Sequence, residues 1–124
     1  TNTDWKVYLS RQSIGDFQIA RAGWIGDYID PKSFLDMMVT GRGNNQTGWS
    51  NKQYDDLLIK AANSTSQEQR FYNFYEAEKI LMDEMPIIPI YTYTRIYMLH
   101  QDVKGWGNNL LDSRPYQFVY LENK

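Results

Sequence analysis

A strand pattern that runs directly into a helix start constrains this sequence most. In "FQIARAGW", residues 17–24, side chains alternate in the way typical of a β-strand, and Arg21 is its one charged residue. Asp30 then precedes Pro31, which favours a helix start, because Asp accepts a bond from a free main-chain N–H and Pro has no N–H to leave unbonded. A strand, a short turn and a helix in this order predict an α/β fold.

Three further helices are predicted, each preceded by a residue that can cap it: Asp4, Ser50 or Thr65. Gly15 is expected to end the first of them. The later two carry apolar stripes at helical spacing that should face the core. These stripes are Tyr54, Leu57, Leu58, Ala61 and Ala62 in the earlier helix and Phe71, Phe74, Tyr75, Leu81 and Met85 in the later one.

Two more stretches have strand character. "MPIIPIYTYTRIYML" is rich in β-formers, although its two prolines exclude a fully paired central strand at its beginning. "YQFVYL", near the C-terminal end, predicts one short strand after a loop. Helices that alternate with strands support a single α/β unit.

Composition and charge exclude several classes of partner and chemistry. The net charge is −2 and no basic run occurs, which argues against binding to nucleic acid or to an anionic membrane. With no Cys and one His, His100, neither a thiolate metal site nor a Ser-His-Asp set is indicated, and no Gly-rich phosphate loop is present. We therefore expect no metal, no cofactor and no catalytic residue, and a surface role for His100.

Asp27 is the acidic residue that most suggests a binding role. It lies between the predicted strand end and the helix start, three residues after Trp24, where ligands commonly meet α/β folds. Asp30 is accounted for as a helix cap, and the other paired acids fall on polar helix faces. Trp24 fits either the core or an aromatic wall beside a main chain that Gly23 and Gly26 leave open.

An extended peptide is the ligand that suits such a strand end. Free main-chain N–H and C=O groups would bond any peptide sequence, and the Asp27 carboxylate would pair with the α-amino group. Arg21, on the same face as Gly23, is expected either to form an ion pair with Asp27 or to meet a ligand carboxylate. A carbohydrate-cleaving enzyme that uses Asp27 and Asp30 is an alternative from another class, although Asp30 beside Pro31 suits capping better than catalysis.

The chain resembles, in order along its length, the C-terminal part of oligopeptide-binding proteins of ABC importers, a family that also holds dipeptide and nickel binders. The resemblance lies in "WKVYLSRQSIGDFQIARAGWIGDYIDPKSFLDMM", "WSNKQYDDLLIKA", "QRFYNFYEAEKILMDEMPIIPIYTYTR" and a closing Trp-rich loop. Family members are several times longer. The resemblance therefore implies a part of the second large lobe of a two-lobed α/β receptor of the class II periplasmic-binding-protein type, which closes on its ligand without chemistry.

The resemblance also implies how the chain is divided. Residues 1–100 would form a portion of the C-terminal ligand-binding lobe. Residues 101–124 would form a loop and strand that pack toward the missing first lobe. An edge of "YQFVYL" left unpaired there is expected to drive self-association or disorder of the isolated chain. Because the site of such a clamp lies between two lobes, the chain alone should bind peptides weakly or not at all.

Three side chains are matched to binding roles by the resemblance. Asp27, in its Gly-Asp-Tyr context, matches the acid that pairs with the ligand's N-terminal ammonium. Trp24 matches a residue that lines a side-chain pocket, and Trp5, in the first helix, matches another. The nickel-binding branch lacks the acid of this motif, so Asp27 favours peptides over metal chelates.

The strand before this motif is matched as well. Arg21 corresponds to a residue that can meet the carboxylate of a short peptide, and the main chain around Gly23 and Ile25 corresponds to the segment that bonds the peptide in strand fashion. Gln12 stands where some members have a second pocket arginine, so that contact is not carried over. Ile25 replaces a different small residue, which leaves the pocket volume and the preferred peptide length open.

The resemblance implies a peptide ligand and ABC permease subunits as partners. It also implies an extracytoplasmic location, in the periplasm or on the outer face of the cell membrane through a lipid anchor of the parent protein. A receptor for another small solute, such as a sugar or a metal chelate, remains an alternative. A protein-interaction module that binds through its aromatic residues is a further one.

Overall fold

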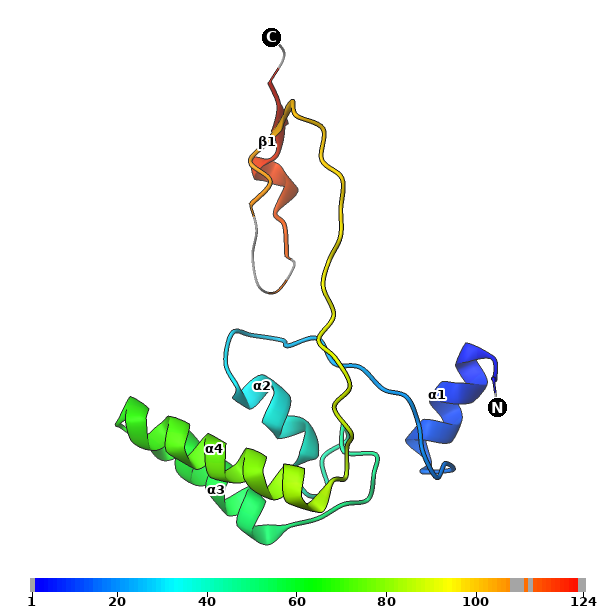
Figure 1. Cartoon of the computed structure of the whole chain (residues 1–124), viewed down its shortest axis with the longest axis vertical. Helices are drawn as coiled ribbons and strands as arrows, with labels where there is room; N and C mark the ends of the chain where they lie inside the picture. The colour runs from blue at the N-terminus through cyan, green and yellow to red at the C-terminus, as the bar shows by residue number, and fades with distance from the viewer. Residues whose placement is uncertain (1, 108–110, 112, 123–124) are drawn as a thin grey trace.

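The computed structural model describes residues 2–107, 111 and 113–122 (Figure 1). Its helices and strands are α1 (Trp5–Ser13), α2 (Lys32–Leu35), the 3₁₀ helix η1 (Asp36–Met38), α3 (Lys52–Asn63), α4 (Gln67–Glu84), β1 (Val103–Lys104), the 3₁₀ helix η2 (Tyr116–Phe118) and β2 (Tyr120–Leu121). None of the helices in these ranges is both long and apolar enough to span a membrane.

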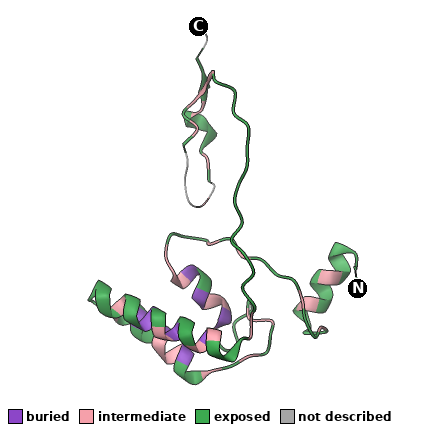
Figure 2. Ribbon diagram, viewed as in Figure 1, coloured by how far each residue is buried: buried purple, intermediate pink, exposed green. Residues whose placement is uncertain are grey.

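The core lies in a helical unit formed by α2, η1, α3 and α4. α3 and α4 pack along each other, and α2 packs against α4 (Figure 1). Every buried residue of the described chain belongs to this unit (Figure 2). The apolar members of the core are Leu35, Met38, Tyr54, Leu58, Ala61, Phe74, Ala77 and Leu81.

The predicted helix starts are confirmed, two of them with a shifted cap. Asp4 caps α1, accepting from the main-chain N–H of Lys6 at 2.9 Å. The later two caps are Asn51, which accepts from the Tyr54 N–H at 3.0 Å, and Ser66. The predictions of Ser50 and Thr65 were wrong by one residue, because two cap-competent side chains are adjacent at each start and the chain places the second in the extended conformation that a cap requires.

The predicted stripe of α4 is only partly correct. Phe74 and Leu81 are buried, as expected, but Phe71, Tyr75 and Met85 are 45%, 61% and 56% exposed. The face that packs on α3 instead includes Asn73 and Ala77, whose small or polar side chains the hydrophobic pattern did not mark. In α3, Tyr54, Leu58 and Ala61 are buried, Leu57 is half-buried and Ala62 is exposed.

The predicted strands are mostly not formed as strands in the described residues. The one sheet is the antiparallel pair β1 and β2, in which Val103 lies opposite Leu121 and Lys104 opposite Tyr120. Residues 17–24 and 86–99 have no ladder, and the latter run in an extended path from α4 to β1 (Figure 1). A strand needs a neighbouring edge, and no described segment supplies one there. Of "YQFVYL", only the end is paired, after η2.

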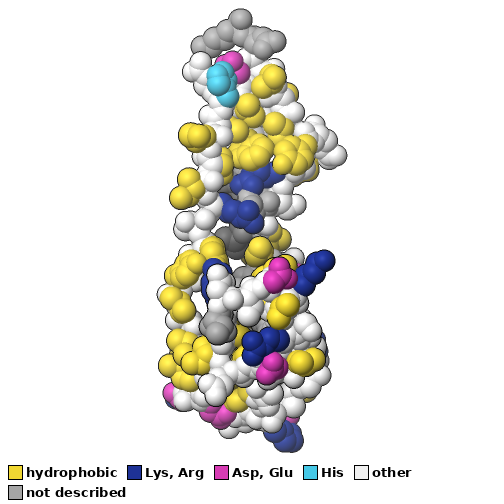
Figure 3. Space-filling model, turned by 90° about the vertical axis from the view of Figure 1, so that its right-hand side faces the viewer, with side chains coloured by type: hydrophobic (Ala, Val, Ile, Leu, Met, Phe, Trp, Pro, Cys, Tyr) yellow, Lys and Arg dark blue, Asp and Glu magenta, His cyan; other side chains and the backbone are white. Residues whose placement is uncertain are grey.

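Apolar side chains are strongly exposed along this extended path. Ile90, Ile96 and Met98 are 83%, 94% and 100% exposed. Figure 3 shows apolar side chains gathered over the upper half of one face, above the helical unit. Exposed apolar surface of this extent marks an interface rather than a free surface.

Candidate functional site

The turn that carries Trp24 and Asp27 is bonded to the start of α2 through one residue, Ser33. The Ser33 hydroxyl accepts from the main-chain N–H of Asp27 at 2.7 Å, and its carbonyl accepts from the Trp24 indole Nε1 at 2.9 Å. Ser33 itself is 4% exposed. The half-buried indole is therefore fixed by packing and by a hydrogen bond, while Asp27 lies on the surface.

The two acids of this turn are used differently. Asp30 Oδ1 accepts from the main-chain N–H of Lys32 at 2.9 Å, as predicted for a helix start, and Oδ2 forms an ion pair at 2.7 Å with Arg70 of α4. Within the ranges that the structure describes, the Asp27 carboxylate has no hydrogen bond or ion pair. An exposed, unpartnered carboxylate remains able to accept from a cationic ligand group.

Arg21 contacts tyrosines rather than Asp27. Its Nη2 donates to the hydroxyl of Tyr93, and its main-chain carbonyl accepts from the hydroxyl of Tyr8 in α1. The predicted alternative of an Arg21–Asp27 ion pair was wrong, because the guanidinium points to the extended segment after α4. The Arg21 guanidinium and the Asp27 carboxylate therefore do not neutralise each other.

Tyrosine hydroxyls change the ionisation of this cluster. The hydroxyl of Tyr91 and, after it, the hydroxyl of Tyr93 raise the pKa of the Arg21 guanidinium, because both oxygens stabilise its charge. The neighbouring Tyr93 hydroxyl and then the Arg21 guanidinium lower the pKa of the Tyr91 hydroxyl. Tyr91 and Tyr93 also contact each other, with ring centroids 4.7 Å apart.

The two glycines of the turn are approached by the chain's own rings. A Cβ atom on Gly23 would lie 3.7 Å from the ring of Tyr93, an ordinary contact. A Cβ atom on Gly26 would lie 3.1 Å from Phe34, which is tight. The expectation that these glycines leave the main chain open holds only for the side away from the rings. On the main chain, Gly23 and Ile25 form no hydrogen bonds with other described residues.

Trp5 is less closely joined to the site. Its ring stacks on Tyr8 with centroids 5.3 Å apart and planes 20° apart, and it is 66% exposed. Tyr8 in turn donates to Arg21, so Trp5 reaches the site through one intermediate residue. Ile25, the remaining predicted residue, is 67% exposed.

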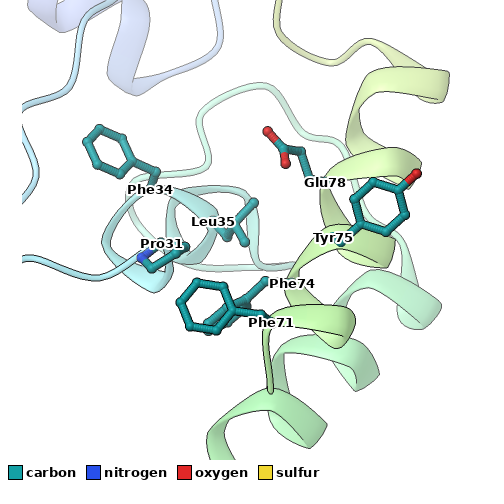
Figure 4. Close-up of a pocket in the computed structure, with 7 residues that line it drawn as sticks. All are labelled: Pro31, Phe34, Leu35, Phe71, Phe74, Tyr75 and Glu78. Atoms are coloured by element: carbon teal, nitrogen blue, oxygen red, sulfur yellow. The ribbon is translucent and has the colours of Figure 1, made fainter. Parts of the chain in front are cut away.

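A groove of about 340 Å³ lies behind the turn, between α2 and α4. Figure 4 shows Phe34 and Pro31 on one side of it and Phe71 and Tyr75 on the other. Phe34, which packs against Gly26, separates the groove from the turn that carries Asp27.

Neither a metal cluster nor a buried histidine occurs in the described residues. They contain no cluster of three or more His, Asp or Glu side chains that suits a metal ion. His100 is 71% exposed and lies 3.5 Å from Asp102, which agrees with its predicted surface role.

Three residues that position the site were not predicted: Ser33, Tyr8 and Tyr93. The position of Ser33, in the first turn after Asp30, was a local signal that could have marked it. Tyr93 is 72 positions from Arg21, and no pattern in one sequence reports such a contact.

No protein-family model matches the chain. Among curated proteins, it is 40% identical over 104 residues to the dipeptide-binding protein DppE of Bacillus subtilis, covering 84% of the chain and 19% of that protein. It is 35% identical over 121 residues to the periplasmic murein peptide-binding protein MppA of Escherichia coli, covering 97% and 22%. The chain thus spans about a fifth of the length of these relatives.

Solved structures give the same result. The chain superposes on Escherichia coli MppA with a TM-score of 0.87 and 34% identity, covering 98% of the chain and 24% of MppA. It superposes on OppA of Burkholderia pseudomallei with a TM-score of 0.88 and 29% identity, covering 99% and 24%. These neighbours are peptide-binding proteins, and the chain reproduces the fold of one part of them. The chain belongs to the family of oligopeptide- and dipeptide-binding proteins, as a C-terminal part of such a protein.

Proposed function

We propose that the chain is part of the solute-binding component of an ABC importer and supplies the half of the site that receives the N-terminus of an extended peptide. The carrying observation is that the exposed Asp27 carboxylate, beside a fixed Trp24, has no partner among the described residues. An α-ammonium group is its natural partner, because the pair is a charge-assisted hydrogen bond.

The main chain supports an extended ligand. The groups of Gly23 and Ile25 that have no partner in the described chain can bond a peptide in strand fashion, which gives affinity independent of sequence. Trp24 and Trp5 would line side-chain pockets, and Arg21 would receive the carboxylate of a short peptide. A peptide as the ligand is supported by relatives named as dipeptide- and oligopeptide-binding proteins, and by Haemophilus influenzae OppA, 28% identical, solved in complex with RPPGFSPFR.

The wider setting follows from the same proposal. The parent protein would close on its ligand, deliver it to the permease subunits of the importer and perform no chemistry on it. Its location would be extracytoplasmic, as the names of the periplasmic relatives support, either in the periplasm or by a lipid anchor on the outer face of the cell membrane. No cofactor is needed for this role.

The test compares a free peptide with its N-acetylated form in the parent protein, by calorimetry. If Asp27 pairs with the ammonium in a closed site, acetylation or Asp27→Asn should each remove about 3 to 5 kcal/mol of binding free energy, because one charge is left buried without its partner. Asp83→Asn, an exposed acid of α4, is the matched control and should bind as wild type does. Equal affinity for the two peptides would exclude the ammonium role.

A receptor for another small solute is the second candidate. One relative, 34% identical over 117 residues, is named a probable deoxycholate-binding periplasmic protein. Deoxycholate has a carboxylate and an apolar body but no ammonium. A receptor for such a ligand would bind it with unchanged affinity after Asp27→Asn, and would bind no peptide.

A further inference from the structure

Arg21 is fixed at both ends by tyrosines from elements far apart in the sequence. The Tyr8 hydroxyl of α1 donates to the Arg21 carbonyl, and Arg21 Nη2 donates to the Tyr93 hydroxyl in the extended segment after α4. The Tyr93 ring also lies near Gly23, two residues along, where an added Cβ atom would be 3.7 Å from it. The tyrosines thus position both the main chain and the guanidinium of Arg21.

We propose that Tyr93 is a positioning residue for peptide recognition: its hydroxyl orients the Arg21 guanidinium toward the carboxylate end of a bound peptide. The inference rests on the function proposed above and names a specificity determinant of the same site. Tyr93 itself acts through Arg21.

A tyrosine suits this task better than an acid would. A carboxylate at the same place would orient the guanidinium but would also neutralise it, so that a ligand carboxylate would gain little from the contact. The Tyr93 hydroxyl is neutral and takes one of the five N–H donors of Arg21, which leaves others for a two-point contact with a carboxylate.

The tyrosine is itself supported. The ring of Tyr91 lies against that of Tyr93, with centroids 4.7 Å apart and planes inclined by 56°. An exposed arginine otherwise samples many rotamers, and the loss of that freedom on binding reduces affinity. Orienting the guanidinium before the ligand arrives removes part of this loss.

The experiment uses the parent protein with di-, tri- and tetra-alanine and their C-terminal amides as probes. Dissociation constants are measured by calorimetry for wild type, Tyr93→Phe, Arg21→Gln and the double variant, with Tyr75→Phe on α4 as the control. We expect Tyr93→Phe to weaken binding of the acid forms roughly 3- to 10-fold, the effect of one hydrogen bond, and to leave the amides unchanged. The double variant should bind like Arg21→Gln alone.

Three outcomes would overturn the inference: equal weakening of acids and amides in Tyr93→Phe, additive effects of the two substitutions, or no effect of Arg21→Gln. A wild type that binds none of these peptides would instead overturn the proposed function. A ligand-independent measurement separates the two cases. Proton exchange of the Arg21 guanidinium, followed by NMR, should be faster in Tyr93→Phe and unchanged in Tyr75→Phe, and unchanged exchange in Tyr93→Phe would refute the contact.

Discussion

Ser33 accepts a hydrogen bond from the main-chain N–H of Asp27 at 2.7 Å, from a buried position in α2. The bond fixes the direction in which the main chain leaves Trp24 and so determines where the Asp27 carboxylate emerges. A single hydroxyl thereby connects the helical core to the proposed ligand contact.

Removing this hydroxyl should loosen the turn without unfolding the helices. In Ser33→Ala we expect the Asp27 amide to exchange its proton about 3- to 10-fold faster, the effect of losing one net hydrogen bond. Hydrogen exchange followed by NMR measures this directly. Ser50→Ala, at an exposed serine that caps nothing, is the control, and an unchanged Asp27 amide in Ser33→Ala would show that the bond does not order the turn.

The shifted cap of α3 gives a second prediction. Asn51→Ala should lower the free energy of unfolding by about 1 kcal/mol, because the Tyr54 N–H loses its acceptor, whereas Ser50→Ala should change it by less than about 0.5 kcal/mol. Asn51 also donates to Glu84 at 2.6 Å. Asn51→Ser keeps an acceptor for the cap and loses the amide donor, so denaturant unfolding of the three variants separates the two contributions. A larger loss in Ser50→Ala than in Asn51→Ala would contradict the structure.

Tyr54 predicts how stability depends on pH. It is fully buried and its hydroxyl donates to the Leu35 carbonyl at 2.6 Å. Burial, with smaller effects from the charges of Asp36 and Asp55, raises its pKa above the ordinary value of 10.0. The unfolded chain therefore releases this proton first as the pH rises, so the contribution to stability is complete below pH 10 and is lost as the pH rises toward the folded-state pKa.

The variant Tyr54→Phe checks both parts of this reasoning. It should lower the free energy of unfolding at pH 7 by about 1 to 3 kcal/mol, because a buried carbonyl loses its donor. It should also flatten the fall in stability above pH 10 relative to wild type. Unfolding by urea at a series of pH values measures both, and identical slopes in the two proteins would refute the assignment.

The exposed segment after α4 predicts the behaviour of the isolated chain. Ile90, Ile96 and Met98 expose apolar side chains on a segment that has no strand partner among the described residues, which favours association with another copy. We expect the chain to sediment above its monomer mass of 14.7 kDa, and the double variant Ile90→Lys, Ile96→Lys to shift it toward the monomer. Thr92→Lys and Thr94→Lys, in the same segment, add equal charge without removing apolar surface and serve as the control. A monomeric wild type would contradict the prediction.

The helices and the turn from Trp24 to Asp30 were predictable from the sequence because their signals are local. Capping side chains, a Pro after Asp30 and apolar spacing act within one or two turns of chain. The predicted helix caps were wrong, by one residue, only where two suitable side chains were adjacent, as at Ser50 and Asn51. The role of Asp30 as a cap was confirmed, but its ion pair with Arg70 was not foreseen.

The strands were not predictable in the same way, because a β-ladder depends on a second segment. Residues 17–24 have the alternation of a strand but no neighbouring edge among the described residues. Likewise, Phe71 and Tyr75 continue a helical apolar pattern on a face that the described chain covers only in part. Both failures are explained by a chain that spans about a fifth of the length of its relatives.

The Asp30–Arg70 ion pair has a mechanical consequence for the site. Together with Ser33, it fastens the turn that carries Asp27 to α2 and α4, whereas Arg21 is fastened to α1 and to Tyr93. The negative and the positive group therefore sit on two separately anchored pieces of chain, with only Ala22 and Gly23 between Arg21 and the anchored Trp24. Rotation of the main chain at Ala22 and Gly23 would therefore change the distance between the Arg21 guanidinium and the Asp27 carboxylate. This distance sets the length of a peptide whose two termini could contact both groups.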